Sequence, residues 1–226
     1  MTVASITTTY RFFSEQGEGI IKKIHAKLGE LALPQARWLH RKEVTSNQVT
    51  ASRMLSIVPI CVMLAYQRYW LSCALVLLAA WTDNIDGRLA RIEDKPKGSM
   101  GGLFDSLVDK LFVIAVVLTI YFYSGFRAWF MTSIVIGESV YLTFAVLYLA
   151  FAVWFYEVPQ EEALKNLSSN SWGRAKLTLE ICATICIIIF LNTNSKVFGL
   201  AAQVLGWCSV KFLIFSFFGK LRRLNI

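Results

Sequence analysis

The sequence has few of the residues from which disulfide scaffolds and zinc sites are built. Its 226 residues include five cysteines and two histidines. The cysteines are odd in number, all lie in apolar runs and never form Cys-x-x-Cys; they are Cys61, Cys73, Cys182, Cys186 and Cys208. We therefore interpret them as small core residues and expect neither a disulfide framework nor a zinc site. His25 and His40 lie in a basic segment and receive no catalytic role.

The sequence also lacks a secretory signal and an internal repeat. The first nineteen residues have no continuous apolar core, so we expect the N-terminus to stay on the side of synthesis. No low-complexity linker divides the chain. We predict a cytoplasmic N-terminal segment over residues 1–46 and a single membrane domain over residues 47–226.

What the sequence has in excess is apolar and basic residues. Hydrophobic residues make up 56% of the chain and the mean hydropathy is +0.52, which favours membrane insertion over an ordinary soluble domain. The formal charge is +8, and Lys and Arg cluster between the apolar runs. This distribution fits an anionic membrane surface or a phosphate-bearing substrate better than a nucleic acid, so no nucleic-acid partner is expected.

Six apolar stretches follow residue 50, several of them near the length of about 20 residues that crosses a bilayer as a helix. They cover residues 51–67, 69–86, 103–122, 128–155, 177–192 and 197–218. The second and third contain acids, so the count of six depends also on charge. The turns expected outside carry one basic residue each: Arg68, Arg127 and Lys196. We therefore predict an all-α integral membrane protein with six transmembrane helices and both termini in the cytoplasm.

An amphipathic helix is predicted before the first span. Apolar residues recur at helical spacing over residues 20–33: Ile20, Ile21, Ile24, Leu28 and Leu31. Lys22, Lys23 and Lys27 lie on the other side, and Pro34 is expected to end the helix. The pattern indicates a helix lying on the membrane surface.

Four aspartates fall at the cytoplasmic ends of the second and third predicted spans. Asp83 and Asp86 are three residues apart, and Asp105 and Asp109 are four apart, so each pair shares a helix face. An antiparallel hairpin brings the four carboxylates together. Any one of these acids could equally be a solvated residue at a helix end, but four on two matched faces make that reading a poor one.

Such a cluster needs compensating positive charge, because each ionised group at membrane depth costs on the order of 3 kcal/mol. Lys110 and Arg91 are expected to offset part of it. Oxygen ligands of this kind suit Mg²⁺, Mn²⁺ or Ca²⁺, and four acids suffice for two ions. A two-ion site acts on phosphoryl centres. The alternative of a small cation or proton transporter remains, although transporters place such acids near the bilayer midplane and carry repeated or broken helices.

The string from Asp83 to Asp109, D-x-x-D-G-x-x-A-R-x9-G-x3-D-x3-D, resembles the signature of the CDP-alcohol phosphatidyltransferase family at every fixed position. Its nine-residue spacer before Gly101 is at the long end for that family. The resemblance implies a membrane enzyme that transfers a phosphatidyl group from CDP-diacylglycerol to a small alcohol and releases CMP. It further implies two Mg²⁺ or Mn²⁺ ions, a homodimer and a place in the bacterial inner membrane.

The resemblance also implies residue roles. Asp83, Asp86 and Asp105 would hold the metal ions, and Asp109 would both ligate metal and act as general base on the acceptor hydroxyl. Residues implied to contact the nucleotide or its diphosphate are Gly87, Ala90, Arg91 and Gly101. Close packing of small residues explains Gly87 and Ala90 equally well, and Arg91 has the alternative of pairing with an acid.

A second match lies at the start of the first span. The segment from Asn47 through Thr50 to Arg53 resembles the family's N-x-x-T-x-x-R element, which implies nucleotide or diphosphate contacts for these three residues. Phosphate recognition would explain an arginine in this position. The alternative is an arginine that extends to the phosphates of the lipid headgroups.

The acceptor is indicated by the start of the fifth span. Residues 172–180 resemble the corresponding segment of phosphatidylglycerophosphate synthases, which implies that Arg174 and Lys176 bind the phosphate of glycerol 3-phosphate. Against this, those enzymes usually have an Arg-Glu pair in the fourth span, where this chain keeps only Glu138. Glu138 is either a site residue or the partner of Lys211 or Lys176. Inositol phosphate, serine and phosphatidylglycerol stay open as acceptors.

Overall fold

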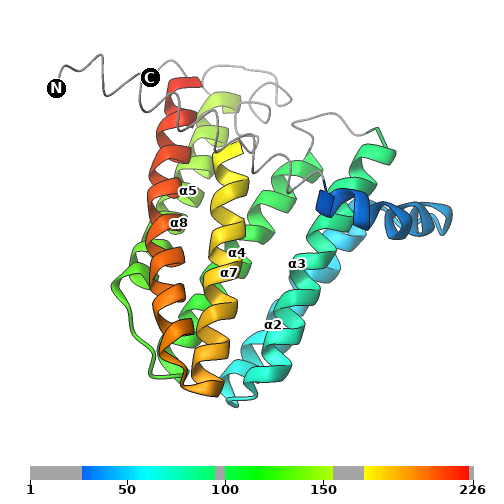
Figure 1. Cartoon of the computed structure of the whole chain (residues 1–226). Coiled ribbons are helices and arrows are strands. Elements are labelled where there is room, and N and C mark those ends of the chain that lie inside the picture. The colour runs from blue at the N-terminus through cyan, green and yellow to red at the C-terminus, as the bar shows by residue number, and fades with distance from the viewer. Residues whose placement is uncertain (1–26, 95–99, 155–170, 224–226) are drawn as a thin grey trace.

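The computed structural model describes residues 27–94, 100–154 and 171–223, and all regular structure within these ranges is α-helical (Figure 1). One helix covers residues 27–41. The longer helices are α2 (Ser46–Ala65), α3 (Tyr69–Ile92), α4 (Met100–Tyr123), α5 (Trp129–Trp154), α7 (Ser171–Thr193) and α8 (Lys196–Arg223). The all-α prediction is confirmed, and each predicted apolar stretch corresponds to one long helix.

Four of the described helices, α2, α5, α7 and α8, are long and apolar enough to cross a membrane. The other two long helices, α3 and α4, have 24 residues each, which corresponds to about 36 Å at 1.5 Å per residue. They have the length of a span but carry the four aspartates. The chain is thus an integral membrane protein, and the crossing of α3 and α4 stays a prediction.

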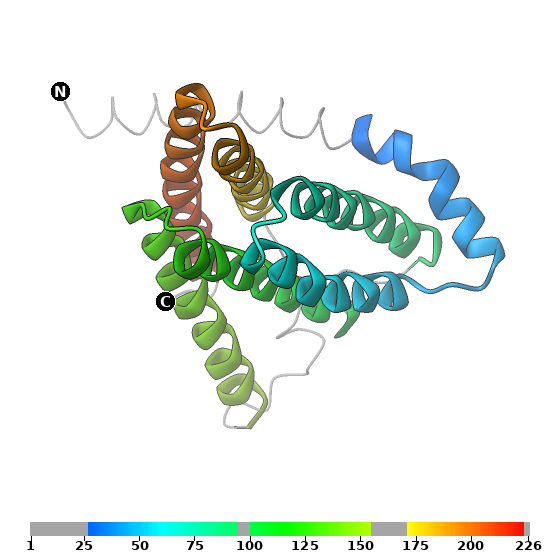
Figure 2. The ribbon, with the colours of Figure 1, turned by 90° about the horizontal axis from the view of Figure 1, so that it is seen from below.

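The six long helices form a closed ring. Helix α2 contacts α3 and α4, α3 contacts α7, and α7 contacts α8. Helix α8 contacts α5, and α5 contacts α4, which closes the ring. Figure 2 shows this arrangement along the bundle, and α4 also contacts α7 across the ring. The core contains buried Ile60, Val76, Val116, Ile134 and Ile187 from five different helices. Helices α3, α4 and α7 therefore lie close enough to form one shared site.

The helix over residues 27–41 crosses the end of α3 instead of running along the bundle (Figure 1). Buried Ala32 and Ala36 pack with Ile85 and Leu89 of α3. The prediction that Pro34 ends this helix is wrong, because the helix continues to residue 41. Pro34 is exposed, so its ring meets no packed neighbour, and the helix continues past it with the loss of one intrahelical hydrogen bond.

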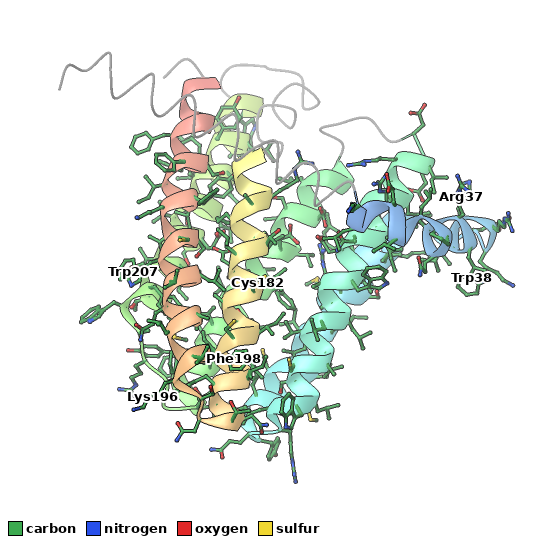
Figure 3. All side chains as sticks on the ribbon, in the orientation of Figure 1. Arg37, Trp38, Cys182, Lys196, Phe198 and Trp207 are labelled. Carbon is green, nitrogen blue, oxygen red and sulfur yellow. The ribbon has the colours of Figure 1, made fainter. Side chains whose placement is uncertain are left out.

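The amphipathic character of this helix is visible in its described part. Figure 3 shows Arg37 and Trp38 on opposite sides of the helix, with Trp38 on the side toward which α2 and α3 extend. Leu31 and Trp38 are 63% and 59% exposed although they are apolar. An apolar side and a charged side fit the predicted position on a membrane surface. The predicted contributions of Ile20, Ile21 and Ile24 lie outside the described residues.

Candidate active site

The start of α2 is fixed by a capping box. The Thr45 hydroxyl accepts a hydrogen bond from the backbone N–H of Gln48, whose side chain accepts one from the Thr45 N–H. Glu93, at the end of α3, accepts hydrogen bonds from the Ser46 N–H at 3.0 Å and the Ser46 hydroxyl at 2.7 Å. These contacts tie the first turn of α2 to the last turn of α3.

Arg53 extends from α2 into the middle of the four aspartates. One terminal nitrogen, Nη1, bonds to Asp83 and lies 3.8 Å from Oδ2 of Asp86. The other, Nη2, bonds to Asp105 and lies 2.9 Å from Oδ1 of Asp109. The arginine side chain is 4% exposed. The structure thus brings together all four acids that helical spacing placed on two matched faces. We call these four aspartates with Arg53 the aspartate centre.

The cation that contacts the acids directly is Arg53. Lys110 offsets part of the charge of Asp105 and Asp109, as expected, but its ammonium donates its hydrogen bonds to the Ser106 hydroxyl at 2.8 Å and carbonyl at 3.0 Å. It also lies 4.5 Å from the ring centroid of Tyr141. Arg91 is exposed. Arg53, which the sequence comparison associated with the diphosphate, therefore provides the direct ion pairs.

Three of the aspartates have the spacing of a metal site. One carboxylate oxygen each from Asp83, Asp86 and Asp105 lie within 4.8 Å of one another. The Thr50 hydroxyl is 3.1 Å from both Asp86 Oδ2 and the Ser46 carbonyl, and its single proton serves one of them at a time. Four carboxylates against one guanidinium leave negative charge to be neutralised. The donor set, all carboxylate oxygen, is one that Mg²⁺ and Mn²⁺ favour.

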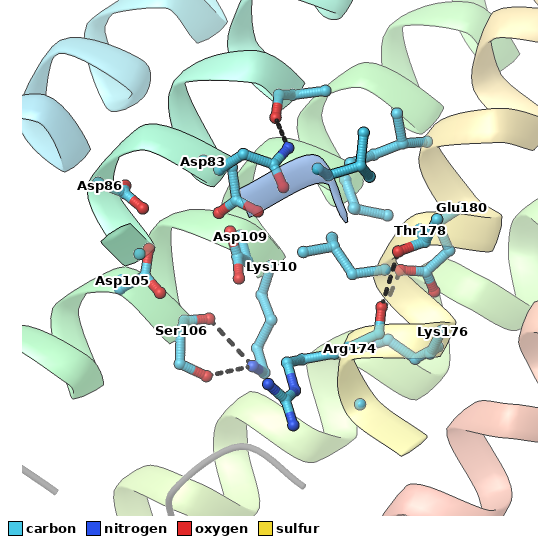
Figure 4. Close-up of a pocket in the computed structure, with 18 of the residues that line it drawn as sticks. Asp83, Asp86, Asp105, Ser106, Asp109, Lys110, Arg174, Lys176, Thr178 and Glu180 are labelled. Atoms are coloured by element: carbon cyan, nitrogen blue, oxygen red, sulfur yellow. Dashed lines mark hydrogen bonds and ion pairs between the residues drawn. The ribbon is translucent and has the colours of Figure 1, made fainter. Parts of the chain in front are cut away.

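A cavity of about 480 Å³ adjoins the aspartate centre. All four aspartates line it, and so do Gly87, Arg91, Arg174 and Lys176. Five predicted site residues do not line its wall: Asn47, Thr50, Arg53, Ala90 and Gly101. Figure 4 shows the aspartates on α3 and α4, with Arg174, Thr178 and Glu180 of α7 across the cavity.

The two predicted site glycines have different surroundings. A Cβ atom at Gly87 would have no heavy atom within 4 Å, so this position leaves open space beside the acids. A Cβ atom at Gly101 would lie 2.6 Å from Oδ1 of Asn47, so this glycine permits the close contact of α4 with α2. Gly87 thus leaves room for a ligand, whereas a side chain at Gly101 would have to displace the side chain of Asn47.

The cavity changes from polar to apolar along the bundle. Leu77 and Trp81 line it within the two turns before Asp83 on α3, and Ile181 and Ile185 line it beyond Lys176 on α7. The charged residues gather at the other end of the same cavity. One space therefore offers both an ionic wall and an apolar wall, as an amphipathic ligand requires.

A second charged group lies on α5 and α7. Lys176 forms an ion pair with Glu138 and lies 3.8 Å from Oε2 of Glu180. The glutamates are 1% and 2% exposed, respectively. We call these three residues the glutamate–lysine cluster. Glu138 pairs with Lys176, one of the two predicted partners, and it also lines the cavity, while its role as a site residue stays a prediction. The sequence analysis did not assign Glu180 to this cluster. The signal that could have indicated it is the position of Glu180 four residues after Lys176 on the same helix.

Comparison with known proteins gives one family and one curated relative. The family model described as CDP-alcohol phosphatidyltransferase matches residues 43–215. A protein of Cereibacter sphaeroides named CDP-diacylglycerol–glycerol-3-phosphate 3-phosphatidyltransferase is 28% identical over 168 residues, which is 71% of this chain and 70% of the relative. No solved structure matches the chain significantly.

Proposed function

This chain belongs to the CDP-alcohol phosphatidyltransferase family, and we propose that it transfers a phosphatidyl group from CDP-diacylglycerol to glycerol 3-phosphate. The enzyme class follows from the family, and the identity of donor and acceptor is the proposal. The observation that carries it is the aspartate centre beside a cavity with one charged and one apolar wall. A transporter that uses the same acids has no comparable support.

The two walls of the cavity support CDP-diacylglycerol as the donor. Its acyl chains fit the apolar wall that includes Leu77 and Ile185, and its diphosphate fits the charged end near Arg91. Gly87 leaves open space in which the cytidine can approach the backbone of α3. Four predicted site residues do not line the cavity, and we propose that they support the lining residues on this side of the site: Asn47, Thr50, Ala90 and Gly101.

A divalent metal site fits the residues present. The oxygens of Asp83, Asp86 and Asp105 approach one another closely, and Asp109 adds a fourth carboxylate that contacts Arg53. We propose that these aspartates hold Mg²⁺ or Mn²⁺ as two ions. Bound there, the ions neutralise the charge on the diphosphate oxygens and favour ionisation of the attacking hydroxyl.

The chain's own groups supply positioning and proton transfer. The acceptor oxygen attacks the phosphorus that carries the diacylglycerol; a new P–O bond forms and the bond to the oxygen of CMP breaks. Asp109 takes the proton of the attacking hydroxyl, and CMP leaves with the bonding pair. Arg53 holds the carboxylates of α3 and α4 in register, because it bonds to acids of both helices.

The acceptor side is formed by α7. Arg174 is exposed at the cavity mouth and provides a guanidinium for a phosphate, with Lys176 behind it. The name of the Cereibacter relative supports glycerol 3-phosphate as this acceptor. We further propose that both termini face the cytoplasm of a bacterial cell, that the site opens to the inner leaflet, and that the enzyme is a homodimer.

The proposal is tested by incubating the purified protein with CDP-diacylglycerol, Mg²⁺ and a panel of acceptors while CMP is measured. The panel contains glycerol 3-phosphate, inositol phosphate, serine and phosphatidylglycerol. We expect CMP release with glycerol 3-phosphate and its loss on addition of a chelator. Absence of CMP with every acceptor would overturn the transferase, and preference for another acceptor would overturn the assignment of glycerol 3-phosphate.

A further inference from the structure

The glutamate–lysine cluster contains buried carboxylate oxygens without donors. Oε2 of Glu138 and both oxygens of Glu180 have no hydrogen-bond partner among the described residues. Both side chains are more than nine-tenths buried, and both line the cavity. A buried polar atom without a partner destabilises the folded state, and the cost is larger if the atom is charged. These oxygens therefore require donors that the described part of the chain does not supply.

The charge of the surroundings indicates the kind of donor. Lys176 pairs with Glu138, and both Lys176 and Lys110 interact with Glu180, so two positive groups already face the two glutamates. A second metal ion there would face both ammonium groups at close range. A neutral donor adds no charge and satisfies the free oxygens, and a hydroxyl group is the donor of this kind that an alcohol substrate brings.

We propose that Glu138 and Glu180 bind a hydroxyl group of the acceptor that does not itself react. The inference rests on the proposed function and specifies its acceptor as a phosphorylated polyol rather than a simple alcohol. Within this subsite Lys176 is a positioning residue, because its ammonium already pairs with Glu138 and lies 3.8 Å from Glu180. Arg174, which is exposed, then carries most of the phosphate recognition.

The subsite is tested with two acceptors that differ by one hydroxyl. Glycerol 3-phosphate has a hydroxyl on its central carbon, and 3-hydroxypropyl phosphate lacks it while keeping the attacking hydroxyl and the phosphate. We expect the wild-type enzyme to prefer glycerol 3-phosphate by about tenfold or more in kcat/KM, since a hydrogen bond to a charged group contributes roughly 1.5–3 kcal/mol.

Glu180→Gln and Glu138→Gln should each reduce this preference severalfold. Each substitution replaces one acceptor oxygen by a donor, and comparing the two acceptors cancels any effect on phosphate binding. Glu180→Asp, which keeps the charge but shortens the side chain, should reduce it as well. KM for CDP-diacylglycerol should stay within about twofold in all three variants. Glu43→Gln, at an exposed residue in the turn before α2, is the matched control and should keep the full preference.

A binding measurement separates this inference from the proposed reaction. In the absence of CDP-diacylglycerol, glycerol 3-phosphate should raise the unfolding temperature of the detergent-solubilised protein more than 3-hydroxypropyl phosphate does. Equal shifts, or a wild-type preference that survives in Glu138→Gln and Glu180→Gln, would overturn the subsite while leaving the transferase intact. Unequal shifts without CMP release would support the subsite and count against the proposed reaction.

Discussion

The aspartate centre and the glutamate–lysine cluster line one cavity but are assembled in opposite ways. In the aspartate centre, four carboxylates from two consecutive helices surround one guanidinium, so negative charge is in excess. In the cluster, two glutamates from α5 and α7 share one lysine, with Lys110 nearby, and the charge is balanced. The first arrangement attracts further cations, whereas the second favours neutral hydrogen-bond donors.

This difference separates chemistry from selection within the proposed enzyme. Excess carboxylate suits the metal ions and proton transfer that any acceptor of this reaction needs. A balanced cluster with unfilled acceptor oxygens discriminates between acceptors, because a buried polar group rejects a ligand that leaves it unpaired. Substitutions in the aspartate centre should therefore reduce turnover with every acceptor, and substitutions across the cavity should change the preference among them.

The largest effect is expected for Asp109→Asn. An amide keeps the size of the side chain but cannot take the proton of the acceptor hydroxyl, so turnover should fall by roughly 10²- to 10⁴-fold. CDP binding, measured by isothermal titration with Mg²⁺ present, should be largely kept. Asp94→Asn, at an exposed aspartate beyond α3, is the control. Turnover equal to that of the wild type would remove the general-base role.

Arg53→Ala should have the next largest effect, on stability as well as activity. It removes the guanidinium from four clustered acids, and breaking a buried ion pair costs about 3–5 kcal/mol. Denaturant unfolding in detergent should show this loss, with partial recovery in Arg53→Lys. Arg68→Ala, at an exposed arginine before α3, should leave the unfolding free energy almost unchanged. If Arg53→Ala were as stable as wild type, the guanidinium would be dispensable for holding the centre together.

Arg174→Ala should have a smaller effect that is confined to the acceptor side. Loss of a charged hydrogen bond to phosphate should raise KM for glycerol 3-phosphate by about ten- to a hundredfold. KM for CDP-diacylglycerol should change little, and the steady-state rates of CMP release give both constants. Arg127→Ala removes an exposed arginine in the α4–α5 turn and is the comparison variant. An equal rise in both KM values would assign Arg174 to the donor side.

The smallest effects should come from the two site glycines, in opposite directions. Gly87→Ala meets no neighbour and improves helix propensity, so it should stabilise the protein by up to about 1 kcal/mol. CDP binding should nevertheless weaken if the nucleotide occupies the open space. Gly101→Ala should lower stability through its contact with Asn47. Unchanged CDP affinity in Gly87→Ala would place the nucleotide elsewhere.

The helices and the aspartate centre were largely predictable, because both depend on local spacing. Apolar runs near the span length predicted the long helices, and separations of three and four residues placed the aspartates on shared faces. The end of the helix over residues 27–41 was not predictable in this way, since a proline costs a helix one hydrogen bond and the packing of Ala32 and Ala36 on α3 can offset that cost. The sequence motif located Arg53 on α2 but did not identify the groups that its guanidinium contacts.

The glutamate–lysine cluster illustrates what local spacing leaves out. Glu138 and Lys176 are 38 residues apart, and their pairing depends on the positions of α5 and α7 in the ring. The sequence left Lys176 and Lys211 as alternative partners of Glu138, and the packing of the helices brings Lys176 to it. Only the structure shows that Glu180 is buried and therefore needs hydrogen-bond donors, because water would satisfy an exposed carboxylate.

By itself, the sequence determined a helical membrane enzyme with four acids in register on two neighbouring helices, because helical periodicity and hydrophobicity act over short distances. The tertiary structure decided which cation pairs directly with these acids, which glycine leaves space and which glutamates lack hydrogen-bond donors among the described residues. These properties depend on the distances between helices that are far apart in the chain, and only packing of the whole ring sets those distances.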